Sequence, residues 1–290
     1  MNNTTLEKRI DWPILLSIIA FHILAGVAMT MITVEGLVSF VILYAISVLG
    51  ITMGFHRYYT HHSFKANKWF GRLLGIMGTL ALQGSVKKWV AHHRLHHAGS
   101  DTESDPHNAN SGFWYSHLLW MLTTDPKFND PKVINRLSRD IMADPFLVFL
   151  SRPIVYVSMQ IILGVLLWWG ISLEAMMWGI WVRVVAVWHV TWFVNSACHI
   201  WGYKNFELVG DRATNNWWVG LLAFGEGWHN NHHAIADSAR HGLKWWEFDI
   251  TWQVIKLSEA FGLVTEVKVA EIPEESVPED GLIPPAAAKP

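Results

Sequence analysis

The chain has 290 residues, 51% of them hydrophobic, and a formal net charge of −2. Charged residues make up only 16%, and 18 tryptophans and 14 phenylalanines favour a protein that exposes apolar side chains to lipid. The near-zero net charge argues against binding to nucleic acid. A single cysteine, Cys198, excludes an intrachain disulfide and a cysteine-based zinc site.

Four apolar segments predict helices that cross a membrane, because each approaches the roughly 20 residues that a hydrocarbon core needs. Short connections around Glu35 and Ser172 pair these segments into two helical hairpins. The first segment is too long for a signal peptide and has no cleavage site. A shorter apolar stretch, 71–82, predicts an interfacial or re-entrant helix. The four predicted spans are 12–33, 38–55, 154–171 and 173–200.

Lysine and arginine are concentrated in the two long connecting parts, 56–153 and 201–266, whereas the short connections carry Glu35 and Glu174. The positive-inside rule therefore predicts that the long parts and both termini, including residues 1–11, are cytosolic. The tail 267–290 is rich in Pro, Glu and Ala and is predicted to be disordered. The fold class is an all-α membrane protein, with one domain over 12–266 and a cytosolic helical cap that carries a metal site.

Sixteen histidines include three tight clusters. The first is His56-Arg-Tyr-Tyr-Thr-His61, and the other two share the pattern H-x-x-H-H. Because positions i, i+3 and i+4 share one face of a helix, each triplet is predicted to aim at one point. Asn195 and His199 are also four residues apart. All four elements fall at or beyond the cytosolic ends of the predicted spans, so they are predicted to meet there. The triplets are His93, His96, His97 and His229, His232, His233.

The clusters and His199 together offer nine nitrogen ligands. Imidazole binds Fe, Zn, Cu and Ni, so ligand type alone does not name the metal. A tetrahedral zinc site leaves at least five of these histidines unused. Two metals with four or five nitrogens each use all nine, with Asn195 bound through a water and a position open for O₂. The predicted ligands are His56, His61, His93, His96, His97, His199, His229, His232 and His233.

The remaining polar residues near these clusters have simpler interpretations. His22 and His189 lie inside predicted spans and are expected to be interior polar groups with hydrogen-bond partners. His62 and His92 are expected to be neighbours of metal ligands. The run Arg57-Tyr58-Tyr59 predicts an interfacial anchor. Carboxylates are expected to fix the imidazole tautomers. Their candidates are Asp105, Asp211 and Glu226, and the histidines expected behind the ligands or at the surface are His107, His117 and His241.

From about residue 10 to 265, this order of boxes and hairpins resembles the membrane-bound fatty acyl desaturases, specifically the Δ9, stearoyl-type branch. The segment Ser238-Ala-Arg-His-Gly-Leu-Lys-Trp-Trp246 is especially similar to bacterial and cyanobacterial members. The other motifs are Gly50-Ile-Thr-Met-Gly-Phe-His56, Asp105-Pro-His-Asn108, Gly112-Phe-Trp-Tyr-Ser-His117, Asn195-Ser-Ala-Cys-His199 and Gly225-Glu-Gly-Trp-His-Asn-Asn-His-His233.

The resemblance implies two iron ions on the nine histidines, Asn195 bound through water, and O₂ as co-substrate. It implies insertion of a cis double bond, at Δ9, into a long saturated acyl chain on a lipid or on CoA. Ala91 and His92 stand where animal acyl-CoA members usually have Arg and Asp, which favours a lipid. A separate electron donor such as ferredoxin or cytochrome b5 is expected, and a bacterial inner or thylakoid membrane.

An acyl chain has no polar handle near its middle, so a narrow apolar tunnel is expected to select the reacting position by shape. Trp192, one turn before Asn195, is a candidate wall. Tyr44 lies twelve residues before His56, about 18 Å along a helix, and is predicted to cap the methyl end.

Other functions remain open. A related di-iron hydroxylase or alkane monooxygenase shares the H-x-x-H-H boxes. A membrane metal transporter that uses histidines predicts ligands within the spans. A zinc hydrolase predicts H-E-x-x-H, which this sequence lacks.

Overall fold

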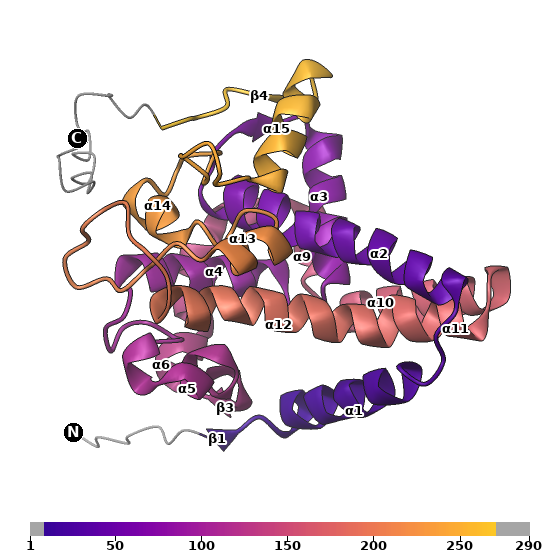
Figure 1. Ribbon diagram of the computed structural model, residues 1–290. Helices are drawn as coiled ribbons and strands as arrows, with labels where there is room; N and C mark the ends of the chain where they lie inside the picture. The colour runs from indigo at the N-terminus through magenta and orange to yellow at the C-terminus, as the bar shows by residue number, and fades with distance from the viewer. Residues whose placement is uncertain (1–8, 271–290) are drawn as a thin grey trace.

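The computed structural model describes residues 9–270, which are mostly helical. Figure 1 shows long helices with short helices and loops gathered around one end of them. The longer helices and their continuations are α1 (Trp12–Ala28), α2 (Val34–Leu49), η1 (Gly50–Thr60), α3 (Lys68–Leu80), α4 (Val86–Ala98), α10 (Pro153–Gly170), α11 (Leu173–Met176), η4 (Met177–Val182), α12 (Arg183–Ser196), η5 (Ala197–His199) and α15 (Ile250–Ala260).

The remaining elements are short. Two antiparallel pairs of strands, β1 with β3 and β2 with β4, tie the ends of the described chain to its middle. The short helices are η2 (Ala109–Ser111), α5 (Phe113–His117), η3 (Leu119–Leu122), α6 (Pro126–Asn129), α7 (Pro131–Leu137), α8 (Arg139–Met142), α9 (Pro145–Leu150), α13 (Trp217–Leu222) and α14 (His229–Ala234). The strands are β1 (Arg9–Ile10), β2 (Lys65–Ala66), β3 (Thr123–Thr124) and β4 (Val264–Thr265).

Among residues 9–270, three helices are long and apolar enough to cross a membrane, and they match three of the four predicted spans. The first predicted span forms a shorter helix, α1, of 17 residues, which is about 26 Å long at 1.5 Å per residue. It ends early because the chain turns after Ala28 to reach Thr33, whose side chain caps α2. The three long helices are Val34–Thr60, Pro153–Gly170 and Leu173–His199.

Apolar side chains cover the outer faces of α1, α2 and α10. Ile23, Val41 and Leu166, one from each helix, are all largely exposed. A continuous exposed surface of this kind is typical of helices that contact lipid. The protein is therefore a membrane protein.

The helix of the second predicted span, Val34–Thr60, changes conformation before it ends. The predicted span stops at residue 55, but the helix continues to Thr60 as the π-helical segment η1. The His61 amide donates to the carbonyl of His56, five residues earlier, at 3.1 Å. Because π-helical hydrogen bonds join residues five apart, this geometry brings two side chains together that an α-helix would turn about 140° apart.

The stretch predicted as an interfacial or re-entrant helix, 71–82, forms α3, which packs against η1. The crossing is so close that a Cβ added to Gly50 would lie 2.1 Å from the amide nitrogen of Gly78. Glycine is thus required where the two backbones touch.

The end of α3 is held by polar side chains from the spanning helices. The Leu80 carbonyl accepts from Gln160 at 2.9 Å and from Arg183, and Trp188 donates to the next carbonyl, Ala81, at 3.1 Å. These carbonyls have no partner within the helix, and each would be costly to leave unpaired away from water. Arg183, a charged residue within a predicted span, therefore stabilises the end of α3.

Two predicted regions fall largely outside the described residues. Only 9–11 of the predicted cytosolic N-terminus and 267–270 of the predicted disordered tail are described.

We predict that Gly50→Ala destabilises the protein by about 1–3 kcal/mol or more, because the added methyl group forces the crossing of η1 and α3 apart. The measurement is the midpoint of thermal unfolding in detergent. Gly26→Ala in α1 is the matched control, since a Cβ there meets nothing within 4 Å. Alanine should stabilise that helix by about 0.5–1 kcal/mol. Equal midpoints for the two variants would contradict the close crossing.

Candidate metal centre

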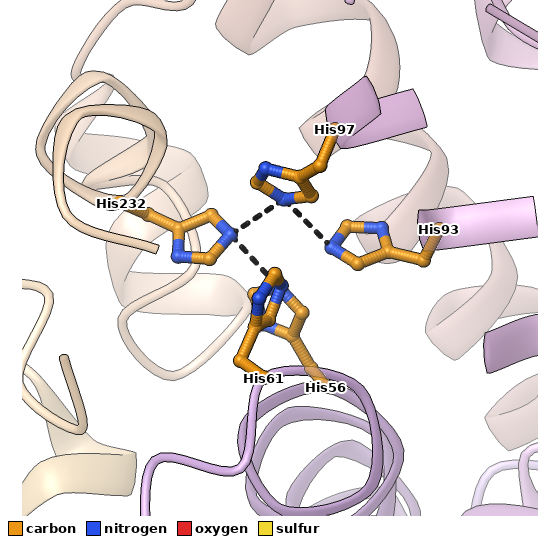
Figure 2. Close-up of side chains that lie close together, drawn as sticks. All are labelled: His56, His61, His93, His97 and His232. Atoms are coloured by element: carbon orange, nitrogen blue, oxygen red, sulfur yellow. Dashed lines mark hydrogen bonds between the residues drawn. The ribbon is translucent and has the colours of Figure 1, made fainter. Parts of the chain in front are cut away.

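The nine predicted histidines form two groups. Within each group the candidate ligand atoms all lie within 4.8 Å of one another. Figure 2 shows the first group, with imidazoles from η1, from His61 directly after it, from α4 and from α14 turned toward a common point. The first group is His56, His61, His93, His97 and His232, and the second is His96, His199, His229 and His233.

The prediction that each H-x-x-H-H triplet aims at one point is wrong. His93 and His97 of α4 belong to the first group, whereas His96 belongs to the second. The triplet of α14 is divided in the opposite sense, with His232 in the first group and the other two in the second. At about 100° per residue, positions i and i+4 differ by about 40°, whereas position i+3 lies about 60° to the other side of i. The odd member therefore reaches the neighbouring group.

The conformation of η1 assembles the first group. His56 and His61 have ring centroids 4.8 Å apart, and each ring also contacts His93 and His232. The Nε2 atom of His61 is buried and has no hydrogen-bond partner among the described residues. The spacing of five residues, which an α-helix would not align, is thus explained by the π-helical end of the second span.

Four carboxylates hold the outer nitrogen of four of these imidazoles. Three were predicted: Asp105 lies 2.9 Å from His96, Asp211 2.6 Å from His233 and Glu226 2.5 Å from His56, each measured to Nδ1. A carboxylate on Nδ1 fixes the proton there and turns the lone pair of Nε2 into the group. The predicted role of these carboxylates in orienting the imidazoles agrees with these contacts.

Sequence reasoning missed the fourth carboxylate, Asp101. Its Oδ2 atom accepts from Nδ1 of His199 at 2.9 Å and from the amide of Arg212 at 2.8 Å. Asp101 lies in the loop after α4, four residues before Asp105, and it meets His199 only in the folded chain. A second aspartate so close to a histidine box was the only available signal in the sequence.

The two asparagines inside the third box were also missed. Asn230 accepts from the amides of Asn205 and Phe206, and Asn231 donates to Glu247 at 2.8 Å. Both side chains are buried. Since α14 has only six residues, it cannot hold its own orientation, and these hydrogen bonds fix the direction in which its histidines point.

The interpretation of Arg57-Tyr58-Tyr59 as an interfacial anchor is wrong. The Arg57 side chain is fully buried and lies 3.1 Å from Glu226 and 3.0 Å from Asp249. Tyr59 is buried too, and its hydroxyl donates to the carbonyl of Gly71. Because η1 turns inward, Arg57 meets the carboxylate that also holds His56. It neutralises a buried charge rather than anchoring the protein at a surface.

The intramembrane histidines are satisfied, as predicted. His22 and His189 lie 2.9 Å apart through their Nε2 atoms, and Nδ1 of His189 lies 3.0 Å from Nε2 of His117. His117 is bonded in turn to Ser196 at 2.9 Å. These rings form a chain between α1, α12 and α5 rather than converging on one point.

The other histidines surround the two groups. His62 is exposed and lies 3.3 Å from Asp140, whereas His92 is buried and bonded to the carbonyl of Phe128. His107 contacts the ring of His96, and His241 contacts the ring of His232. The predicted neighbouring roles of His107 and His241 agree with these ring contacts.

Most histidines of the two groups favour the uncharged form. Burial, followed by the mutual repulsion of neighbouring imidazoles, holds the pKa values of six of them well below the ordinary value for histidine. A neutral imidazole is the form that binds a metal ion. These six are His61, His93, His97, His229, His232 and His233.

The donor set fits two transition-metal ions. His96 and His233 both have Nδ1 on a carboxylate, so their Nε2 atoms, 3.2 Å apart, face each other as two lone pairs. Such an arrangement is repulsive unless a cation lies between the nitrogens. Metal–nitrogen bonds of about 2.1 Å place neighbouring ligands at right angles about 3.0 Å apart. The contacts of His232 with His56 and His97, at 3.0 and 2.9 Å, agree with that spacing.

A cavity of about 1230 Å³ extends from the first group between the spanning helices. His93, Asn195 and Trp192 line one end of it, so the candidate wall residue does face this space. Tyr44 is not among the lining residues. Its hydroxyl donates to the carbonyl of Leu222 at 2.8 Å, so the cavity does not support its predicted role at the methyl end of a substrate.

Three polar side chains beside His93 are bonded to one another at the cavity wall. Trp89 donates to Gln83 at 3.0 Å, and Gln83 donates to Thr191 at 2.6 Å. All of them line the cavity. Because these three side chains already form hydrogen bonds with one another, the wall can face an apolar ligand without leaving a polar group unpaired.

We predict that Asp101→Asn lowers the affinity of the second group for a transition metal by roughly 10- to 100-fold, since His199 loses the carboxylate that orients it. The measurement is the metal content of purified protein by mass spectrometry after dialysis against a chelator. Asp237→Asn, which alters an exposed pair with Lys268, is the control. Equal metal content in the two variants would contradict the assignment.

Comparison with known proteins places these features in a family. The fatty acid desaturase family model matches residues 10–261. An sn-1 stearoyl-lipid 9-desaturase of Anabaena variabilis is 49% identical over 77% of this chain and 80% of its own. An acyl-CoA C20 Delta5-desaturase of Anemone leveillei is 43% identical over 78% and 72%, respectively. A palmitoyl-monogalactosyldiacylglycerol delta-7 desaturase of Arabidopsis thaliana is 41% identical over 90% and 70%. The chain belongs to the fatty acid desaturase family.

Proposed function

We propose that this protein inserts a cis double bond at the Δ9 position of a long saturated acyl chain carried by a membrane lipid, with two bound iron ions and O₂ as co-substrate. The observation that carries this proposal is the pair of histidine groups at one end of a large cavity. Family membership makes the protein an oxidoreductase that acts on fatty acyl chains.

The nine histidines would hold the iron, five in the first group and four in the second, with Asn195 bound through a water. Bound iron would supply the metal–oxygen chemistry that breaks an unactivated methylene C–H bond, which no amino-acid side chain can break. The second group has only four histidines, so an ion there would keep coordination positions for a water or O₂. The family supports iron over the other metals that imidazole binds.

The cavity would hold the acyl chain. It is lined along the helix Leu173–His199 from Asn195 to Met176, nineteen residues or about 28 Å apart at 1.5 Å per residue. Trp192, and the bonded side chains of Gln83, Trp89 and Thr191, would press on the chain where it passes His93. Selection of the reacting carbon then depends on how far the chain extends past the histidines.

Two observations support a lipid as the acyl carrier. The relative from Anabaena variabilis acts on a stearoyl lipid, although the relative from Anemone leveillei is named for acyl-CoA. Ala91 is fully buried, and His92 is bonded to the carbonyl of Phe128. Neither side chain is free to bind a soluble carrier.

The proposed arrangement in the membrane follows the charge asymmetry of the sequence. α1 would cross the membrane in addition to the three long helices, which gives four spans. The metal centre and both termini would lie in the cytosol. The membrane would be a bacterial inner membrane or a thylakoid membrane. Reduction of O₂ to water takes four electrons, of which the acyl chain provides two. The other two would come from a separate donor such as ferredoxin or cytochrome b5.

We predict that expression in a host with a known lipid profile yields a new monounsaturated acyl chain, detected by gas chromatography of the methyl esters. His232→Ala should abolish the product, because the Nε2 atom of His232 points into the first group and lies 3.0 and 2.9 Å from those of His56 and His97. An alcohol in place of the alkene would instead indicate the related di-iron hydroxylase.

We predict that Gly164→Leu shifts the preferred substrate from stearoyl to palmitoyl chains. Gly164 lines the cavity, and a Cβ there lies 3.6 Å from Ile180, so a leucine side chain fits but fills the space beyond it. Gly170→Leu on the same helix is the control, because nothing lies within 4 Å of its Cβ and it does not line the cavity. The ratio of the two products measures the shift. An unchanged ratio in Gly164→Leu would show that this end of the cavity does not set chain length.

A further inference from the structure

The cavity is not enclosed on all sides. Along α10, side chains that line it are also largely exposed: Val157 at 44%, Ile161 at 61%, Val165 at 45% and Trp168 at 53%. They recur every three or four residues and so form one continuous stripe along the helix. Within Pro153–Gly170, only Gln160 is buried. The cavity-facing side of α10 is therefore not covered by protein.

The opposite edge of this opening is α1. Pro13 and Ser17 line the cavity and are exposed, whereas Ile18 and Phe21 lie deeper. α1 packs against η4, at the end of the bundle away from the short helices, and Figure 1 shows it set apart from the other long helices toward its N-terminus. The space between α1 and α10 is thus a groove, whereas the sequence predicted a narrow apolar tunnel.

The polarity of the groove changes along its length. At the ends where α1 and α10 begin, its lining includes Asp11, Lys87, Lys88 and Arg152. Further along, the lining is mostly apolar, and it reaches Ile180, which is only 3% exposed. A polar rim above an apolar slot has the same order of polarity as a membrane lipid, with its head group at the interface and its chains below.

We infer that the groove between α1 and α10 is open to the bilayer and receives one acyl chain of a glycerolipid sideways, while the head group stays at the polar rim. The inference rests on the proposed function for the identity of the chain, and it adds the route. The acyl chain would move sideways from the surrounding lipid into the groove while its head group stays in the membrane. It would therefore not need transfer by a soluble carrier. Its apolar surface would move from lipid to protein at little cost in hydration.

The test uses a photoreactive lipid and does not depend on bound metal. The protein is placed in vesicles of dioleoyl phosphatidylcholine that contain a small fraction of phosphatidylcholine with a stearoyl-length chain and a diazirine at its methyl end. After illumination, mass spectrometry maps the labelled residues. Because Ile180 is buried behind the groove, label there reports a chain inside it. Label on Leu166, which is exposed and does not line the groove, measures ordinary contact with lipid.

Two neighbouring residues of α10 provide a matched pair of variants. Ile161 lines the groove and is 61% exposed, whereas Ile162 is 58% exposed and does not line it. We expect Ile161→Trp to reduce labelling of Ile180 at least fivefold relative to Leu166, and Ile162→Trp to leave the ratio unchanged. No label on Ile180 in the wild type, or equal ratios in the two variants, would overturn the inference.

The two proposals fail separately. Labelling of Ile180 without any desaturated product in the wild type would leave the groove in place and refute the proposed function. Desaturation of vesicle lipid without labelling of Ile180, and with equal rates for Ile161→Trp and Ile162→Trp, would refute the groove alone.

Discussion

The structure depends on bringing nine imidazoles together, although nitrogen lone pairs that face one another repel. Burial lowers the pKa values of six of these rings, so those six do not relieve the repulsion by taking up protons. Carboxylates fix the direction of four rings, and Arg57 compensates the buried charge of Glu226. Asn230 and Asn231 fix α14 through its surroundings rather than through its own length. The fold thus holds an arrangement that is favourable only around cations.

Periodicity and spacing predicted the features that depend on local sequence, namely the spans and the histidines of the metal centre. The apolar segments gave three spans close to their observed bounds, and composition within the boxes identified all nine histidines of the two groups. What failed depends on three-dimensional direction. The π-helical end of the second span, which buries Arg57, has no simple sequence pattern, and Asp101 meets His199 across 98 positions. Helix geometry alone separates the i+3 histidine of each triplet from the other two, but which group each part joins follows from how α4 and α14 face each other.

The protein has two regions of different polarity. At one end, charged and polar side chains are buried and bonded in networks, which makes that end rigid. Between the spanning helices, the cavity walls are mostly apolar and partly open, with polar atoms such as those of Gln83 and Thr191 paired to each other. A reaction on an apolar chain needs both properties, because the histidines must not move while the chain must slide past them.

The exchange of histidines between α4 and α14 has a mechanical consequence. Each helix places two rings in one group and one ring in the other. If α14 turned about its axis, it would withdraw His232 from the first group and the rings of His229 and His233 from the second at the same time. The two groups therefore cannot be adjusted independently, and the distance between them is set by the packing of two helices rather than by a flexible loop. If the two groups hold two metals, as we propose, dividing the triplets constrains the metal separation more firmly than two complete triplets would, each binding its own metal.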